Sequence, residues 1–324
     1  MKAKRLTTLT GLPYYIKVNM QITERNFTGN TDLDAMAELV CKFPAENIHF
    51  VDLPYRLCSW SFDYPENIRL WTDENGQLLA WAVLQVPFWT IDYAYDPTFH
   101  HELYPQILKW ADEHAKKIVN TPSGHSAWFI TALASQADHI RDLEQAGFAS
   151  QANVGEDSWS QVLMGHSMQI PNTVDLPDGF HIRPLNGTGE VEAYVNLHQA
   201  VFESKNMTIA WRQRTLQRPE YIPDLDLVAV APNGQLAAFC ICWLAKDSNG
   251  NVSGQIEPLG VHADFRKLGL ARAILVEGLK RLSAKGAQKI YVQTDNFRNA
   301  AFHLYESAGF HVTHDILMYR KDYE

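Results

Sequence analysis

The sequence has no apolar run long enough to cross a bilayer. A transmembrane helix needs about 20 predominantly apolar residues, and no stretch of this chain approaches that length. The amino terminus lacks the apolar segment that follows the basic start of a signal peptide. We therefore expect a cytoplasmic protein with no membrane partner. Residues 1–19 do not resemble the start of a domain and are interpreted as a vector remnant or an upstream start, and residues 20–25 predict the first strand.

Basic residues and cysteines are also scarce. The chain has 28 lysines and arginines against 37 aspartates and glutamates, a net charge of −9, and no basic block, so we expect no nucleic-acid partner. Cys41, Cys58, Cys240 and Cys242 lack the spacing of a zinc site and are expected to be reduced core thiols. The 13 histidines include no HExxH motif, so no metal is expected.

Internal repetition is present in a chain of 324 residues, which is about twice the usual length of a domain. Three landmarks recur in the same order: residues 75–78 with 233–236, 95–99 with 261–265, and 143–148 with 305–310. The first landmark is an Asn-Gly hairpin signal in both places. The sequence therefore predicts two copies of one domain, a first copy at residues 20–168 and a second copy at residues 178–324, joined by a turn-rich segment.

The hydrophobic pattern of the second copy predicts a series of strands followed by two strand–helix units. Strands are expected at residues 180–184, 225–231, 235–244, 253–261, 289–294 and 312–320, and helices between 189 and 217, at 270–285 and at 299–308. The helix at 270–285 directs an apolar stripe to the sheet (Ala273, Ile274, Val276, Leu279, Leu282) and charges to water (Arg272, Glu277, Lys280, Arg281, Lys285). The expected fold class is α+β: two tandem domains, each a mixed, mostly antiparallel sheet flanked by helices.

The most specific signal is a basic, glycine-containing turn, through which an apolar strand passes directly into a helix. Amides of a first helical turn have no intrahelical partner and lie at the positive end of the helix dipole, where an anion docks. Gly269 permits a left-handed backbone and close approach of phosphate oxygens, and Arg266 and Lys267 add positive charge. The turn therefore predicts a pyrophosphate site. A second helix follows, with Tyr305 and a Gly-Phe step at its end.

Together these two segments resemble the GNAT superfamily of acyl-CoA-dependent N-acetyltransferases, over roughly residues 180–320. The resemblance implies that the turn at residues 266–271 cradles the pyrophosphate of acetyl-CoA and that the helix at residues 299–310 flanks the pantetheine and thioester. The last small residue of the turn is Ala271, where glycine is commoner. The implied coenzyme contacts are Leu259, Val261, Arg266, Lys267, Leu268, Gly269, Leu270, Ala271, Arg272 and Asn299.

Acyl transfer needs a deprotonated amine, a polarised thioester carbonyl and a protonated leaving thiolate. Tyr305 is the candidate acid, because a phenol with a pKa of about 10 stays protonated at neutral pH; the alternative is a packed tyrosine. Glu257 is the candidate base, acting through water, although it could instead bind the substrate's ammonium group or pair with an arginine. Pro258 and Gly260 predict a bulge in the strand, which frees the Val261 amide as an oxyanion donor.

For two residues near these motifs, the sequence is consistent with either a structural or a binding role. Asn299 either caps its helix or binds pantetheine. Trp211 falls where the variable helices of the family line the acceptor pocket, and core packing explains it equally well. His262, His303 and His311 lie near the motifs and are given no role.

The first copy lacks the same chemistry. Residues 100–105 stand where the basic turn stands in the second copy, with Leu103 in place of the glycine and Glu102 adding negative charge. Leu143 takes the position of Tyr305. We expect the first copy to be a structural or substrate-shaping half.

The sequence therefore predicts an enzyme that transfers an acetyl group from acetyl-CoA to a small-molecule or peptide amine. The acidic balance favours a cationic acceptor. The alternative is a non-catalytic acyl-CoA-binding regulatory protein, which needs the turn but neither Tyr305 nor Glu257. A nucleotide-binding oxidoreductase is disfavoured, because the turn does not have the GxGxxG pattern.

Overall fold

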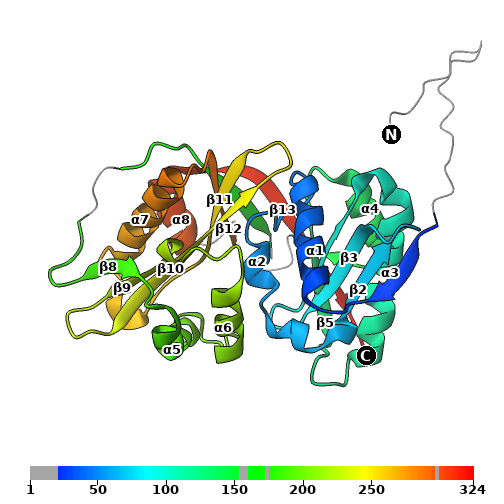
Figure 1. Ribbon diagram of the computed structural model, residues 1–324, viewed down its shortest axis with the longest axis horizontal. Coiled ribbons are helices and arrows are strands. Elements are labelled where there is room, and N and C mark those ends of the chain that lie inside the picture. The colour runs from blue at the N-terminus through cyan, green and yellow to red at the C-terminus, as the bar shows by residue number, and fades with distance from the viewer. Residues whose placement is uncertain (1–20, 153–159, 172–174, 296–298) are drawn as a thin grey trace, which may run out of the picture.

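One continuous sheet runs through both copies in the computed structural model, which describes residues 21–152, 160–171, 175–295 and 299–324. Within these residues the sheet has 13 strands, in the order β1-β2-β3-β4-β5-β13-β7-β12-β11-β10-β9-β8, with β6 beside β13. Figure 1 shows that helices cover both faces of the sheet in each copy. The predicted α+β fold class is confirmed.

The first copy contributes β1 (Thr23–Asn26), α1 (Asn30–Lys42), α2 (Leu53–Arg56), β2 (Ile68–Thr72), β3 (Leu78–Gln85), β4 (Thr90–Tyr95), α3 (His100–Ile118), β5 (Ala127–Leu133), α4 (Ala137–Gln145), β6 (Ala149–Ser150) and β7 (Gln161–His166). The second copy contributes β8 (His181–Pro184), α5 (Val191–Phe202), α6 (Ile209–Gln217), β9 (Asp226–Val230), β10 (Leu236–Lys246), β11 (Val252–Val261), α7 (Leu270–Ala284), β12 (Lys289–Asp295), α8 (Asn299–Ser307) and β13 (Phe310–Asp322). Each element predicted in the second copy occurs within a few residues of its expected place.

The three repeated landmarks occupy equivalent places in the two copies. Gly76 and Gly234 have φ of 80° and 86° in the turns before β3 and β10. Short 3-10 helices follow β4 and β11, at Pro97–Phe99 (η3) and Ala263–Phe265 (η6). In each copy the last helix ends at a left-handed glycine that leads into the next strand. The predicted internal repetition is therefore present in the fold.

The copies exchange strands where they join. Strand β7 comes from the first copy but lies between β12 and β13 of the second. Strand β13 pairs with β7 from Phe310 to Ile316 and with β5 of the first copy from Ile316 to Asp322. Each copy is thus completed by a strand of the other, and the ranges 20–168 and 178–324 remain predictions for the limits of independent folding units.

The apolar stripe of α7 packs as predicted. Its members Ala273, Ile274, Val276, Leu279 and Leu282 are all buried. The four cysteines are free thiols, with three of them buried and Cys41 half-buried. Gly278 brings α7 close to β10, because a Cβ at this glycine would lie 2.8 Å from Cys242 Sγ.

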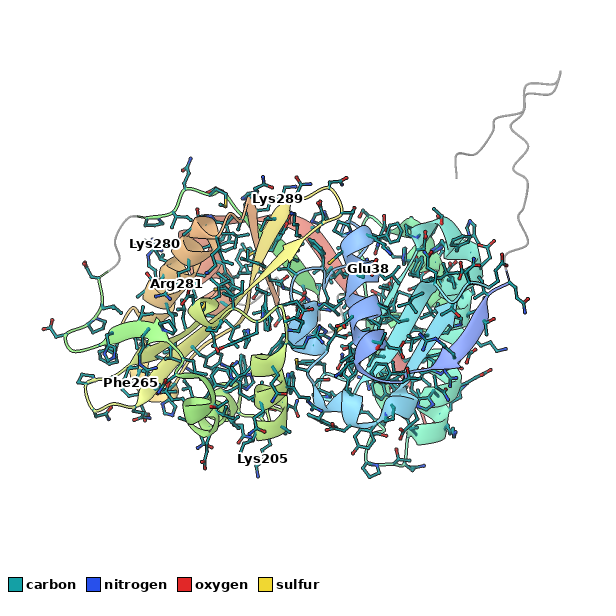
Figure 2. The ribbon with its side chains drawn as sticks, in the orientation of Figure 1. Glu38, Lys205, Phe265, Lys280, Arg281 and Lys289 are labelled. Atoms are coloured by element: carbon teal, nitrogen blue, oxygen red, sulfur yellow. The ribbon has the colours of Figure 1, made fainter. Side chains whose placement is uncertain are left out.

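The charged face of α7 differs from the expectation that it only meets water. Arg281 pairs with Glu277 at 2.8 Å and donates to the carbonyl of Asp224 at 2.9 Å, so it ties the helix to the segment before β9. Figure 2 shows Lys280 and Arg281 on α7. Among the described residues, no helix combines the length and apolar character that crossing a bilayer requires.

The strand exchange predicts that β7 is needed to keep the second copy soluble. A fragment of residues 178–324 lacks β7 and leaves the edges of β12 and β13 unpaired, and unpaired edges promote aggregation. A fragment of residues 160–324 keeps β7 and also lacks β5, so it is the matched control. We expect a larger soluble, monomeric fraction for residues 160–324 in size-exclusion chromatography, and equal solubility of the two fragments would contradict this.

Candidate active site

Strands β11 and β12 part in the middle of the second copy. They pair in parallel only from Ser253–Lys289 to Gln255–Tyr291. On its other side β11 stays paired with β10, with a register shift opposite Cys240 and Cys242. The predicted bulge around Pro258 is therefore confirmed, and a gap opens between the carboxyl ends of β11 and β12.

Main-chain groups of β11 line this gap. The amide of His262 donates to the carbonyl of Ala237 at 2.9 Å. In an antiparallel pair, alternate residues bond the same neighbour, so Gly260 and His262 face β10. The amides of Leu259 and Val261 consequently face away from β10, toward the gap, as the predicted coenzyme contacts require.

The basic turn opens onto the same gap. It follows η6 and contains two left-handed residues, Lys267 with φ of 66° and Gly269 with φ of 81°. The first intrahelical bond of α7 runs from the amide of Ala273 to the carbonyl of Gly269 at 3.1 Å. The amides of the three preceding residues therefore begin the helix without an intrahelical acceptor. A Cβ at Gly269 would meet no atom within 4 Å, which leaves open space beside the turn.

The arginines of the turn have different partners. Arg266 is exposed, and its Nε donates to the carbonyl of Val261 at 3.4 Å. Arg272 donates to the carbonyl and the hydroxyl of Ser307, each at 2.8 Å. The side chain of Arg272 thus joins α7 to α8. Lys267 and Leu268 are exposed, with Leu268 at 44%.

Glu257 lies half-buried on β11, where the strands begin to part. The pKa of its carboxyl group is raised to about 8, first by burial and then by the charge of Asp52, while the charge of Arg56 lowers it. The carbonyl of Glu257 accepts a hydrogen bond from Trp243 Nε1 at 2.7 Å. A carboxylate with this pKa can accept a proton near neutral pH, as a general base must.

Tyr305 lies on α8 and is 8% exposed. It packs in the cluster between the sheet and α7, with its ring 5.7 Å from that of Phe310. Burial raises the pKa of its phenol, and the charge of Glu257 raises it further. Tyr305 therefore lies close enough to Glu257 to be affected by its charge, and the hydroxyl group of Tyr305 stays protonated.

The first copy reaches into this site through α2, which sequence reasoning missed. The carbonyl of Tyr55 accepts from Trp211 Nε1 at 3.2 Å, and its ring lies 5.2 Å from that of Trp211 and 6.3 Å from that of Trp243. Trp211 is buried at this contact, so the structure supports its packing interpretation. In Figure 1, α2 lies beside α6 at the join of the copies.

A signal for α2 is nonetheless present in the sequence. Asp52 and Arg56 interrupt an apolar run whose residues 51–59 are all buried. Arg56 pairs with Asp92, with its Nε 2.6 Å from the carboxylate. Charges four residues apart in a buried run indicate a functional or paired position, but the sequence does not reveal that Glu257 lies nearby.

The first copy has no equivalent of the basic turn. Helix α3 begins at His100, directly after η3, so the residues that correspond to the turn are wound into its first helical turn. The ring of His100 links Asp142, at 3.1 Å, to the hydroxyl of Tyr95, at 2.7 Å. Tyr95 also bonds His139, and these side chains pack with the buried Tyr104. The predicted loss of the cradle is therefore visible in the backbone.

The remaining residues near the motifs make local contacts or lie outside the described part of the chain. The side chain of Asn299 lies outside the described residues, so its two interpretations remain open. The ring of His262 accepts from the amide of Asp264, and His303 bonds Glu306. Among the described residues, no group of three or more His, Cys, Asp or Glu side chains is arranged to hold a metal ion.

Comparison with known proteins finds one family model and several curated relatives. The model of the acetyltransferase (GNAT) family matches residues 191–310. A mycothiol acetyltransferase of Kineococcus radiotolerans is 35% identical over 141 residues, which cover 42% of this chain and 44% of that protein. One of Nocardiopsis dassonvillei is 32% identical over 194 residues, covering 51% and 59%. The chain spans about half the length of the curated relatives that it matches.

Solved structures resemble the whole chain. A GCN5-related N-acetyltransferase from Sphaerobacter thermophilus has a TM-score of 0.60 at 21% identity, covering 93% of this chain and 95% of that one. A tandem GNAT protein from the clavulanic acid biosynthesis pathway has a TM-score of 0.59 at 12% identity, covering 93% and 98%. At these sequence identities the similarity shows that the fold is shared and nothing more specific.

The chain matches the acetyltransferase (GNAT) family over residues 191–310, within the second copy, and its overall fold is similar to that of solved GNAT and tandem GNAT proteins. Its tandem architecture is similar to that of mycothiol synthase, and the curated relatives carry the name mycothiol acetyltransferase.

The strand that carries Glu257 has room only for glycine at position 260. A Cβ at this position would lie 2.5 Å from Val201 Cγ1 and 2.6 Å from Phe239 Cζ. We expect Gly260→Ala to lower the free energy of unfolding by about 1–3 kcal/mol through overpacking, measured by denaturant titration. Gly189→Ala is the control, because its nearest neighbour would be 3.9 Å away. Equal stability of the two variants would contradict the steric argument.

Proposed function

We propose that the chain is an acetyl-CoA-dependent N-acetyltransferase whose reaction takes place in the second copy. The observation that carries this proposal is a carboxyl group with a pKa of about 8 on the strand whose Leu259 and Val261 amides face the gap, together with the buried phenol of Tyr305, whose pKa the charge of this carboxyl group raises. Each of these groups supplies one requirement of acyl transfer to an amine.

The residues present fit the coenzyme. The amides of residues 268–272 and the side chains of Arg266 and Lys267 are suited to its diphosphate, because they supply donors and positive charge beside open space. The amides of Leu259 and Val261 are suited to pantetheine, which would run along the parted strand. Acetyl-CoA supplies the thioester that is cleaved.

Glu257 then acts on the acceptor. Its carboxylate takes the proton of the ammonium group, directly or through water, so that the free amine can attack. The amide of Val261 donates to the carbonyl oxygen on which negative charge develops. As the carbon–sulfur bond breaks, Tyr305 gives its hydroxyl proton to the leaving thiolate, whose conjugate acid has a pKa of about 8.5 if it behaves like a cysteine thiol. The phenolate then takes the remaining extra proton from the acylated nitrogen, which yields the neutral amide and restores Tyr305. The acceptor is a small-molecule amine, a class that the names of the curated relatives support.

A thiol-release assay with acetyl-CoA and a panel of amines tests the function. We expect Glu257→Gln to reduce kcat/KM by about 10²- to 10⁴-fold, the usual value of a general base, and Tyr305→Phe to reduce kcat. Both variants should bind coenzyme A with unchanged affinity in titration calorimetry. Tyr64→Phe, in the first copy, is the control for removing a hydroxyl group. Tight coenzyme binding without thiol release from the wild type would favour the regulatory alternative.

The pKa of Glu257 predicts a pH dependence. The base is inactive when protonated, so kcat/KM should rise with pH and level off above about 8. Asp52→Asn removes a negative charge that raises this pKa, so the rise should move to lower pH. The acceptor amine titrates equally in both enzymes, so its contribution cancels when one acceptor is used. Asp322→Asn, at the end of β13, should leave the profile in place, and an upward shift in Asp52→Asn would contradict the assignment.

A further inference from the structure

A cavity of about 410 Å³ lies where the two copies join. The second copy contributes Ser253 and Gln255 of β11 and Tyr291 of β12, and the first copy contributes Ile48, Phe50 and Val51. Figure 2 shows Lys289, which also lines the cavity, at the start of β12 near this join. A volume of this size is typical of small-ligand pockets.

Gln255 is a fully buried polar residue among those that line this cavity. It is 1% exposed, and its Nε2 has no hydrogen-bond partner in the described part of the chain. A buried amide without a hydrogen-bond partner is destabilising. An oxygen of a ligand in the cavity would remove this cost.

Trp243 lies between Gln255, which lines the cavity, and Glu257. It lies directly opposite Gln255 on β10, so the two side chains share one face of the sheet. Its indole runs from there to the carbonyl of Glu257, to which Nε1 donates at 2.7 Å. The opposite face carries Ile256, which packs in the cluster below α7. The cavity therefore lies on the face of the sheet away from α7, as do Trp243 and α2.

Distance along the strand limits what the cavity can hold. Gln255 precedes Glu257 by two residues, which corresponds to about 7 Å along a strand. An acceptor whose amine lies at Glu257 would therefore have its oxygen near Gln255 if about five carbon atoms separate its nitrogen from that oxygen. The apolar wall from the first copy suits the carbon chain between them.

We propose that this cavity binds the body of the acceptor and that Gln255 selects amines that carry a carbonyl or hydroxyl oxygen at that distance. The proposal rests on the proposed acetyl transfer, because the acceptor's amine must reach Glu257. Gln255 is a specificity-determining residue in this account, and the first copy forms the apolar half of the acceptor site.

Two isosteric probes test the selection. 5-Aminopentanamide carries the oxygen, and 5-methylhexylamine has the same shape without it. With acetyl-CoA and the wild-type enzyme, we expect kcat/KM to be roughly 10- to 100-fold higher for the amide, the equivalent of one buried hydrogen bond. Gln255→Leu should abolish this preference and leave the affinity for coenzyme A unchanged. Gln217→Leu, on the exposed face of α6, should keep the preference.

Leu163→Trp gives a second variant that fills the cavity from β7 without changing its polarity. Binding of 5-aminopentanamide is measured separately by saturation-transfer NMR, and we expect a signal in the wild type that is lost in Leu163→Trp. Absence of that signal in the wild type, or an unchanged preference in Gln255→Leu, would overturn the proposal. Binding to the cavity without thiol release would instead overturn the proposed function and leave the cavity as a ligand site.

Discussion

The parting of β11 from β12 is the constraint on which the second copy's site depends. Parallel strands that stay paired use all their main-chain groups on each other. Here pairing ends at Gln255 and Tyr291, and the bulge beyond it leaves Leu259 and Val261 facing a gap. The same bulge carries Glu257 and leads directly into the basic turn. The proposed coenzyme contacts, the proposed base and the proposed pyrophosphate site therefore all follow from one local departure from regular pairing.

The electrostatics of the site come from both copies. The pKa of Glu257 is shifted first by burial and then by the charges of Asp52, which directly precedes α2, and of Arg56, which ends it. Their position depends on Tyr55, which is held between Trp211 and Trp243. The exchange of β7 and β13 fixes this arrangement, because it makes the copies share one sheet. A first copy without a cradle thus retains a role in shaping the second.

Divergence of the two copies is visible in one backbone change. In the second copy, a loop with left-handed Lys267 and Gly269 precedes α7. In the first copy the helix begins four residues earlier, at the position that corresponds to Arg266, and the hydrogen-bonded Asp142, His100 and Tyr95 stand beside it. In the first copy these residues form the first turn of α3, so they place side chains where the loop of the second copy places main-chain amides. The loss of one glycine is therefore accompanied by a change in the whole segment.

The sequence alone determined the local features. The periodic patterns, the turn at Gly269 and the bulge at Pro258 were predictable because each depends on residues close together in the chain. The repetition was predictable for the same reason. Tertiary structure decided the remainder: that β7 joins the second copy, that Asp52 and Arg56 lie near Glu257, and that Gln255 ends in a cavity. These arrangements join residues about 100 to 200 positions apart, and no pattern within a single segment encodes such a contact.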